Sequence, residues 1–278
     1  MTTKNPITYI SSFLSVQGGE VEFIRFGNGN KLLICFHGFG DNAELFKSIA
    51  PSLSQGYTVY AISLPYHGNT AWKESNFGVG DFIEIVEVIQ KETGADRFSL
   101  MGYSMGGRVT LCLLEHFATQ LDKVFLCASD GIRTHKIYNF SLMPTWYVRT
   151  AKLLVMIPAV LFGLVNFAYR FGFVSKFLFD FTNNHLATRK QRKRFFSCIH
   201  FFRHTTINLK DVQTLLNKHN IPVEMYFGIR DEVILLDGVK KFQHGLQNAR
   251  LYELNKGHLL IDKDLDILLD EHLNTTIA

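Results

Sequence analysis

The chain has few cysteines, and their positions exclude the common structural and chemical uses of cysteine. Only four occur among 278 residues, at Cys35, Cys112, Cys127 and Cys198, and no two of them have C-x-x-C spacing. Cys35 and Cys127 lie in apolar runs typical of strands, and Cys112 lies in a helical pattern. We therefore expect buried, reduced thiols rather than a disulfide framework or a zinc site.

The chain also lacks a strong charge of one sign and a leading targeting segment. Its 29 Lys and Arg residues and 25 Asp and Glu residues leave a formal net charge of +4, too small for the dense basic face of a nucleic-acid-binding protein. Residues 1–10 lack a basic segment followed by an apolar core, so no secretory signal is predicted. We expect a cytoplasmic protein with no nucleic-acid partner.

What the chain has is a regular alternation of short apolar runs with helical patterns. An antiparallel hairpin, Ile7 to Leu14 and Glu20 to Phe26, is expected first. The further strand candidates are 31–36, 57–63, 97–101, 123–128, 223–227 and 250–254. Strands that alternate with helices predict right-handed βαβ units, and therefore a mostly parallel sheet with helices on both faces.

The alternation stops between about residues 133 and 205, where long aromatic-rich helical stretches replace the strands. The simplest interpretation is a helical cap inserted after the sixth strand, above the C-terminal edge of the sheet where ligands bind in open α/β folds. The sequence thus predicts a core domain of residues 1–132 and 206–278 and a cap of residues 133–205.

Two segments of the predicted cap have more than one interpretation. Residues 153–169 are nearly all apolar, but they contain Pro158 and are barely long enough to span a bilayer. They could form a helix pair over a pocket or core, a surface in weak contact with a membrane, or a true span. The basic run 189–194 could be a solvated helix face, or a surface for an anionic substrate or lipid.

The most informative motif is a turn around Ser104. Gly102 and Gly106 flank the serine at positions minus two and plus two, an apolar strand precedes it, and a helical pattern follows it. This is the spacing of a nucleophile elbow, in which small neighbours allow a strained serine to project its hydroxyl from the fold.

A serine nucleophile needs a base, a group that orients the base, and donors for the developing oxyanion. His258 follows the last predicted strand and is the candidate base. Asp231 follows the preceding strand and is the candidate acid, with Asp130 as its competitor. The backbone N–H groups of Phe39, in a His-Gly-Phe-Gly loop, and of Met105 are the candidate oxyanion donors.

Together these motifs identify the chain as resembling the α/β-hydrolase superfamily, in particular its capped serine esterase and lipase branch. The resemblance implies a mostly parallel eight-stranded sheet, a Ser-His-Asp triad, an acyl-enzyme intermediate, and no metal or organic cofactor. The serine nucleophile disfavours the dehalogenase and epoxide-hydrolase branches.

The expected substrate is a small molecule, a carboxylic ester or thioester with an apolar acyl or aromatic part, because pockets of this kind are mostly apolar. Tyr103, Phe162 and Phe167 are the residues expected to contact it. Two alternatives stay open: C–C bond hydrolysis or a lyase step on the same triad, and a slow-turnover ligand receptor of the same fold. The sequence leaves the oligomeric state undetermined.

Overall fold

The structure is a computed structural model that describes residues 6–136 and 144–275. The chain divides into two compact units. The first consists of residues 1–74, 78–138 and 207–278, and the second of residues 75–77 and 139–206. The first unit contains every strand found in the described residues, and the second is helical.

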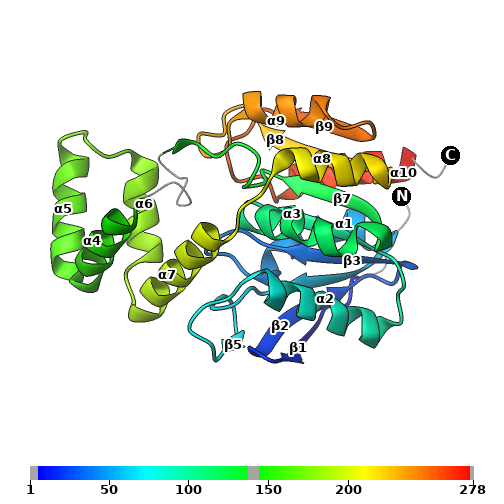
Figure 1. The fold of residues 1–278 in the computed structure, drawn as a ribbon, viewed down its shortest axis with the longest axis horizontal. Coiled ribbons are helices and arrows are strands. Elements are labelled where there is room, and N and C mark those ends of the chain that lie inside the picture. The colour runs from blue at the N-terminus through cyan, green and yellow to red at the C-terminus, as the bar shows by residue number, and fades with distance from the viewer. Residues whose placement is uncertain (1–5, 137–143, 276–278) are drawn as a thin grey trace. The chain divides into compact units, whose positions relative to one another are not determined.

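The first unit is built on one mixed sheet (Figure 1). Its strands are β1 Ile10–Val16, β2 Gly19–Phe26, β3 Lys31–Phe36, β4 Tyr57–Ile62, β5 Ala71–Trp72, β6 Phe98–Tyr103, β7 Leu121–Cys127, β8 Val223–Gly228 and β9 Ala249–Leu254. They are ordered β1-β2-β4-β3-β6-β7-β8-β9, and the two-residue β5 pairs with β2. All pairs from β4 to β9 along this order are parallel, whereas β2 is antiparallel to its neighbours. The predicted fold class is confirmed, with β5 as a short addition.

Apolar side chains cover both faces of the sheet, as a largely parallel sheet requires. In β3, Leu33 and Cys35 join a core cluster with Leu53 and Leu265, from the helices on one face. The intervening Phe36 points to the other face, where its ring packs edge-on against Phe82 with centroids 6.1 Å apart. Helices are therefore needed on both sides to keep these side chains from water.

The helical segments of the first unit supply that cover. They are η1 Ala43–Ile49, α1 Ala50–Leu53, α2 Val79–Thr93, α3 Met105–Phe117, η2 Ala118–Gln120, α8 Leu209–Lys218, α9 Leu236–His244 and α10 Lys263–Thr275. Helix α3 packs against both α2 and α8, and α1 packs against α10 (Figure 1). This arrangement leaves the carboxyl ends of the parallel strands as the place where connecting turns gather.

The four cysteines are free thiols, as predicted. Cys35, Cys127 and Cys198 are buried, and Cys112 is half-buried. Burial raises the pKa of Cys112 and of Cys127 to about 12, because a thiolate would lose its hydration there. The thiols are therefore protonated at neutral pH and poor nucleophiles.

The second unit contains α4 Thr145–Met156, α5 Pro158–Arg170, α6 Lys176–His185 and α7 Arg189–His204. The apolar segment 153–169 is divided at Pro158, which opens α5 at a position where its missing N–H costs no hydrogen bond. The segment thus belongs to two helices in contact with each other. Among the helices of the described residues, none combines the length and the apolar character that a membrane span needs.

Candidate active site

Ser104 lies at the sharp turn between β6 and α3, in a backbone conformation that serine rarely adopts. Its φ is 50° and its ψ is −116°. Three backbone hydrogen bonds hold it there: its N–H donates to Cys127 O at 3.0 Å, and its carbonyl accepts from the N–H groups of Gly107 and Asp130, each at 2.9 Å. Strain of this kind persists only where the surroundings impose it, and here it turns the hydroxyl away from the sheet.

The two glycines of the motif allow the strand, the turn and the helix to pack this closely. A Cβ on Gly106 would lie 1.9 Å from the carbonyl oxygen of Phe36, at the end of β3. A Cβ on Gly102 would lie 2.4 Å from Gly106 O. Any larger residue would push α3 off the sheet, so the spacing read from the sequence reflects backbone contacts.

The structure brings Ser104, His258 and Asp231 together in one hydrogen-bonded relay. Ser104 Oγ lies 2.8 Å from His258 Nε2, and His258 Nδ1 lies 2.8 Å from Asp231 Oδ2. Because a carboxylate accepts hydrogen bonds, the imidazole proton lies on Nδ1, and Nε2 is left to accept from the Ser104 hydroxyl. The relay has the polarity needed to remove a proton from serine.

Asp231 is held by its own second oxygen. Its Oδ1 accepts the N–H groups of Val233 at 2.8 Å and Ile234 at 2.9 Å, and its side chain is fully buried. These two hydrogen bonds leave Oδ2 free to face His258. The acid is therefore preorganised, and no other charged side chain is needed to orient it.

Asp130, the competing acid, serves a different pair. Its Oδ2 accepts from Arg108 Nε at 2.6 Å, and its Oδ1 accepts from the Thr134 hydroxyl. Both members of the ion pair are nearly buried. Asp130 neutralises a buried guanidinium, and the structure places Asp231 rather than Asp130 on the imidazole.

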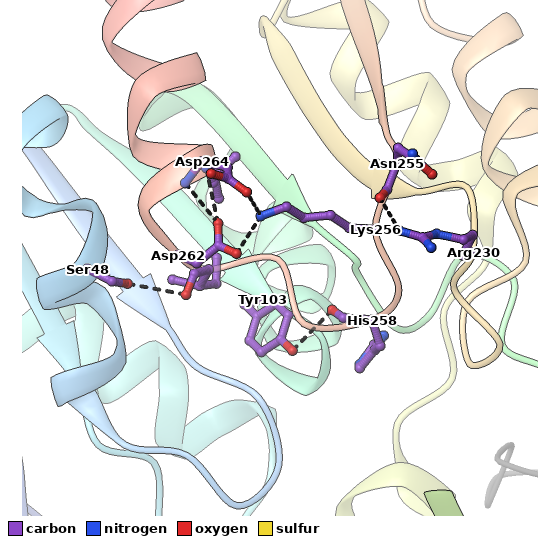
Figure 2. Close-up of polar contacts among 10 residues, drawn as sticks. Ser48, Tyr103, Arg230, Asn255, Lys256, His258, Asp262 and Asp264 are labelled. Atoms are coloured by element: carbon purple, nitrogen blue, oxygen red, sulfur yellow. Dashed lines mark hydrogen bonds and ion pairs between the residues drawn. The ribbon is translucent and has the colours of Figure 1, made fainter.

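The loop that carries His258 is tied down on several sides (Figure 2). The Lys256 ammonium forms ion pairs with Asp262 and Asp264. The backbone N–H of Arg230 donates to Lys256 O at 2.9 Å, and the Tyr103 hydroxyl donates to His258 O at 3.2 Å. The loop thus reaches Ser104 with little freedom to move, which favours a fixed imidazole position.

The Lys256 contacts also leave an electrostatic signature. Burial by itself would raise the pKa of Asp262, but hydrogen bonds from Lys256 and from backbone N–H groups outweigh burial and lower that pKa. Asp262 therefore stays ionised through the neutral range and keeps its hold on Lys256. Neither residue stands out in the sequence, because the pairing depends on how the loop folds back.

Gly228, at the end of β8, makes room for the same loop. A Cβ there would lie 2.4 Å from Gly257 O and 2.5 Å from Lys256 O, both of which are backbone atoms. The close approach brings the loop that carries His258 beside the turn that carries Asp231. Only glycine permits this approach without moving the loop.

We expect Gly228→Ala to displace the His258 loop. The clash should destabilise the fold by about 1–3 kcal/mol and lower turnover by about a hundredfold, because a displaced imidazole is poorly aligned with Ser104. Thermal unfolding and steady-state kinetics measure the two effects. Gly80→Ala is the matched control, because a Cβ at Gly80 meets nothing within 4 Å. Equal turnover in the two variants would contradict the positioning role of Gly228.

The loop that carries Phe39 follows β3, which is the neighbour of β6 in the sheet, with Phe36 paired to Gly102. His37 fixes the start of this loop. Its Nε2 accepts the Leu64 N–H at 3.0 Å, so its Nδ1 carries the proton and donates to Gly38 O at 2.6 Å. Met105 opens α3, where the first-turn N–H groups point toward the N-terminus. The two predicted oxyanion donors thus come from adjacent strand ends.

The three residues expected to contact substrate have different surroundings. Tyr103 is only 3% exposed, and its hydroxyl supports the His258 carbonyl, so it braces the catalytic loop from below. Phe162 and Phe167 lie on α5 of the second unit, where Phe162 is half-buried and Phe167 is exposed. Their contact with substrate stays a prediction. The described residues contain no group of three or more His, Cys, Asp and Glu side chains placed to hold a metal ion.

Comparisons with known proteins agree with this geometry. The sequence profile described as alpha/beta hydrolase fold matches residues 31–198, more than half of the chain. The uncharacterized hydrolase YugF of Bacillus subtilis strain 168 is 24% identical over 263 residues, which cover 93% of this chain and 94% of that protein.

Two solved structures share the architecture. A bacterial membrane phospholipase A has a TM-score of 0.68 and 20% identity, over 96% of this chain and 85% of that chain. The 2-hydroxy-6-oxo-6-phenylhexa-2,4-dienoate hydrolase of Rhodococcus sp. strain RHA1 has a TM-score of 0.68 and 19% identity, over 98% of this chain and 100% of that chain. At these identities the likeness concerns the fold.

Proposed function

The chain belongs to the α/β-hydrolase family, and on that premise we propose that it is a serine hydrolase of carboxylic esters or thioesters with an apolar acyl or aromatic part. The observation that carries the proposal is the relay from Asp231 through His258 to Ser104, with both hydrogen bonds at 2.8 Å. The strained serine and the fixed acid support it, because both hold the relay in place before substrate arrives.

In the proposed reaction, His258 Nε2 removes the hydroxyl proton as Ser104 Oγ attacks the acyl carbonyl carbon. Asp231 stabilises the imidazolium that forms. The N–H groups of Phe39 and Met105 donate to the oxyanion of the tetrahedral intermediate, and each such donor contributes about 3–4 kcal/mol of transition-state stabilisation.

Collapse of the intermediate breaks the ester or thioester bond. His258 returns its proton to the departing alcohol or thiol, and the acyl group stays on Ser104 Oγ. A water molecule then enters, His258 removes one of its protons, and the hydroxide adds to the acyl carbon. The second collapse releases the carboxylic acid and returns the proton to Ser104. The cycle uses only groups of this chain and water.

A series of p-nitrophenyl esters of increasing acyl length, with a matched acyl thioester, tests the proposal. We expect turnover of the esters that rises with acyl length up to a limit, since an apolar pocket favours longer chains by about 0.8 kcal/mol per buried methylene. Silence toward every ester, with saturable binding of an aromatic ligand, would contradict the proposal. Cleavage of a diketone under the same conditions would then favour C–C hydrolysis, and its absence a receptor.

A further inference from the structure

The second unit carries a charge that the rest of the chain does not share. Residues 75–77 and 139–206 contain ten Lys and Arg residues but only one carboxylate, Asp180, which gives a formal charge of +9. Because the whole chain has a formal charge of +4, the first unit has a charge of −5. The mild overall charge hides a strongly cationic unit.

The same unit exposes a large amount of apolar surface. On α5, Val160, Leu164, Phe167 and Phe171 recur at helical spacing along one stripe, and Phe167 is 60% exposed. None of the residues of α5, all of which the structure describes, is buried. Amphipathic helices normally bury such a stripe, so this one is available to a partner.

Helix α4 presents a matching stripe. Trp146, Leu153 and Ile157 lie seven and then four residues apart, and each is more than half exposed. Ile157 joins α4 to α5, so the two stripes meet at the connection between the helices. We call the exposed apolar side chains of α4 and α5 together the α4–α5 surface.

Cations border the α4–α5 surface. Arg149 and Lys152 are exposed on α4, within one turn of Leu153, and Arg170 is exposed at the last turn of α5. Long basic side chains can lay their stems along an apolar surface while their charged ends reach an anionic layer. The combination is that of helices that lie in a membrane interface.

We propose that the α4–α5 surface docks on an anionic phospholipid bilayer, with the apolar stripes among the acyl chains and the basic residues at the headgroups. The charge selects this occupant. A second copy of the chain would bring two units of +9 together, whereas an anionic leaflet attracts each cation near it. The proposal is independent of the triad, because docking requires no turnover.

Vesicle flotation with the full chain tests the proposal. We expect it to float with vesicles that contain phosphatidylglycerol and to stay behind with vesicles of phosphatidylcholine alone. Raising the salt concentration should weaken the binding, because it screens the cations from the headgroups. Ser104→Ala should bind as the wild type does, which separates docking from hydrolysis.

Two sets of substitutions locate the surface. Arg149→Gln with Lys152→Gln should weaken binding about thirtyfold, or about fivefold per cation. Leu153→Gln, Leu164→Gln and Phe171→Gln together should weaken it by at least about tenfold, through lost apolar burial. Circular dichroism and thermal unfolding should be unchanged, because all five side chains are exposed.

The controls change equally exposed residues of the first unit. Ile10→Gln, Phe13→Gln and Ile267→Gln remove three exposed apolar side chains there, and Lys210→Gln with Lys218→Gln removes two exposed cations. Neither control set should alter flotation. Equal binding to both kinds of vesicle, or equal losses in the control and test variants, would overturn the proposal. So would wild-type self-association, measured by light scattering, that the α4–α5 substitutions abolish without changing vesicle binding.

Discussion

Ser104→Ala is expected to lower ester turnover by about six orders of magnitude, because members of such a relay act as a unit and the nucleophile has no substitute. His258 would then lack a proton to remove from the enzyme, and no acyl-enzyme could form. Turnover is measured with the best p-nitrophenyl ester, after purification that excludes traces of wild type. The melting temperature should stay close to that of the wild type, since alanine fits the space of serine.

Two further variants make this first expectation specific. Ser52→Ala removes a buried hydroxyl that donates to Ile49 O, far from the relay in sequence, and should leave turnover within about twofold. Ser104→Ala combined with His258→Ala should be no slower than Ser104→Ala alone. A double variant that loses a further large factor would mean that His258 acts independently of Ser104.

Asp231→Asn is expected to lower turnover by about four orders of magnitude with little effect on the fold. The asparagine carbonyl oxygen can still accept the N–H groups of Val233 and Ile234. Its amide then faces His258 Nδ1 as a donor, so the imidazole proton moves to Nε2. An Nε2 that carries a proton cannot accept one from Ser104.

Asp130→Asn is the matched control for this second expectation. It weakens the buried pair with Arg108, so it should lower stability by about 3–5 kcal/mol while changing turnover per folded molecule by less than about tenfold. Thermal unfolding and active-site titration separate the two quantities. If Asp130→Asn loses the four orders and Asp231→Asn does not, the assignment of the acid is wrong.

Much of the fold and the elbow could be predicted because their causes are local. The strand before Ser104, its flanking glycines and the helix after it are all neighbours in the chain. Asp231 and His258 could be named as candidates because they follow the ends of successive strands, and parallel strands bring such turns to one edge of a sheet. The choice between Asp231 and Asp130 needed the structure, because Arg108 and its ion pair decide it.

The supports of the site could not be predicted, because they depend on contacts between distant segments. The Lys256 ion pairs, the His37 tautomer and the space that Gly228 leaves each arise from how one loop meets another. The apolar segment 153–169 was correctly expected to allow a helix pair. Its exposure was not predictable, since periodicity identifies an apolar face and does not say what covers it.

Labelling with a fluorophosphonate probe tests the central claim most directly: that His258, oriented by Asp231, activates the Ser104 hydroxyl. The account predicts one covalent adduct per chain, mapped by peptide mass spectrometry to Ser104. It also predicts no adduct in Ser104→Ala and labelling at least about a thousandfold slower in His258→Ala. An adduct on another residue, or labelling of Ser104 at an unchanged rate without His258, would contradict it.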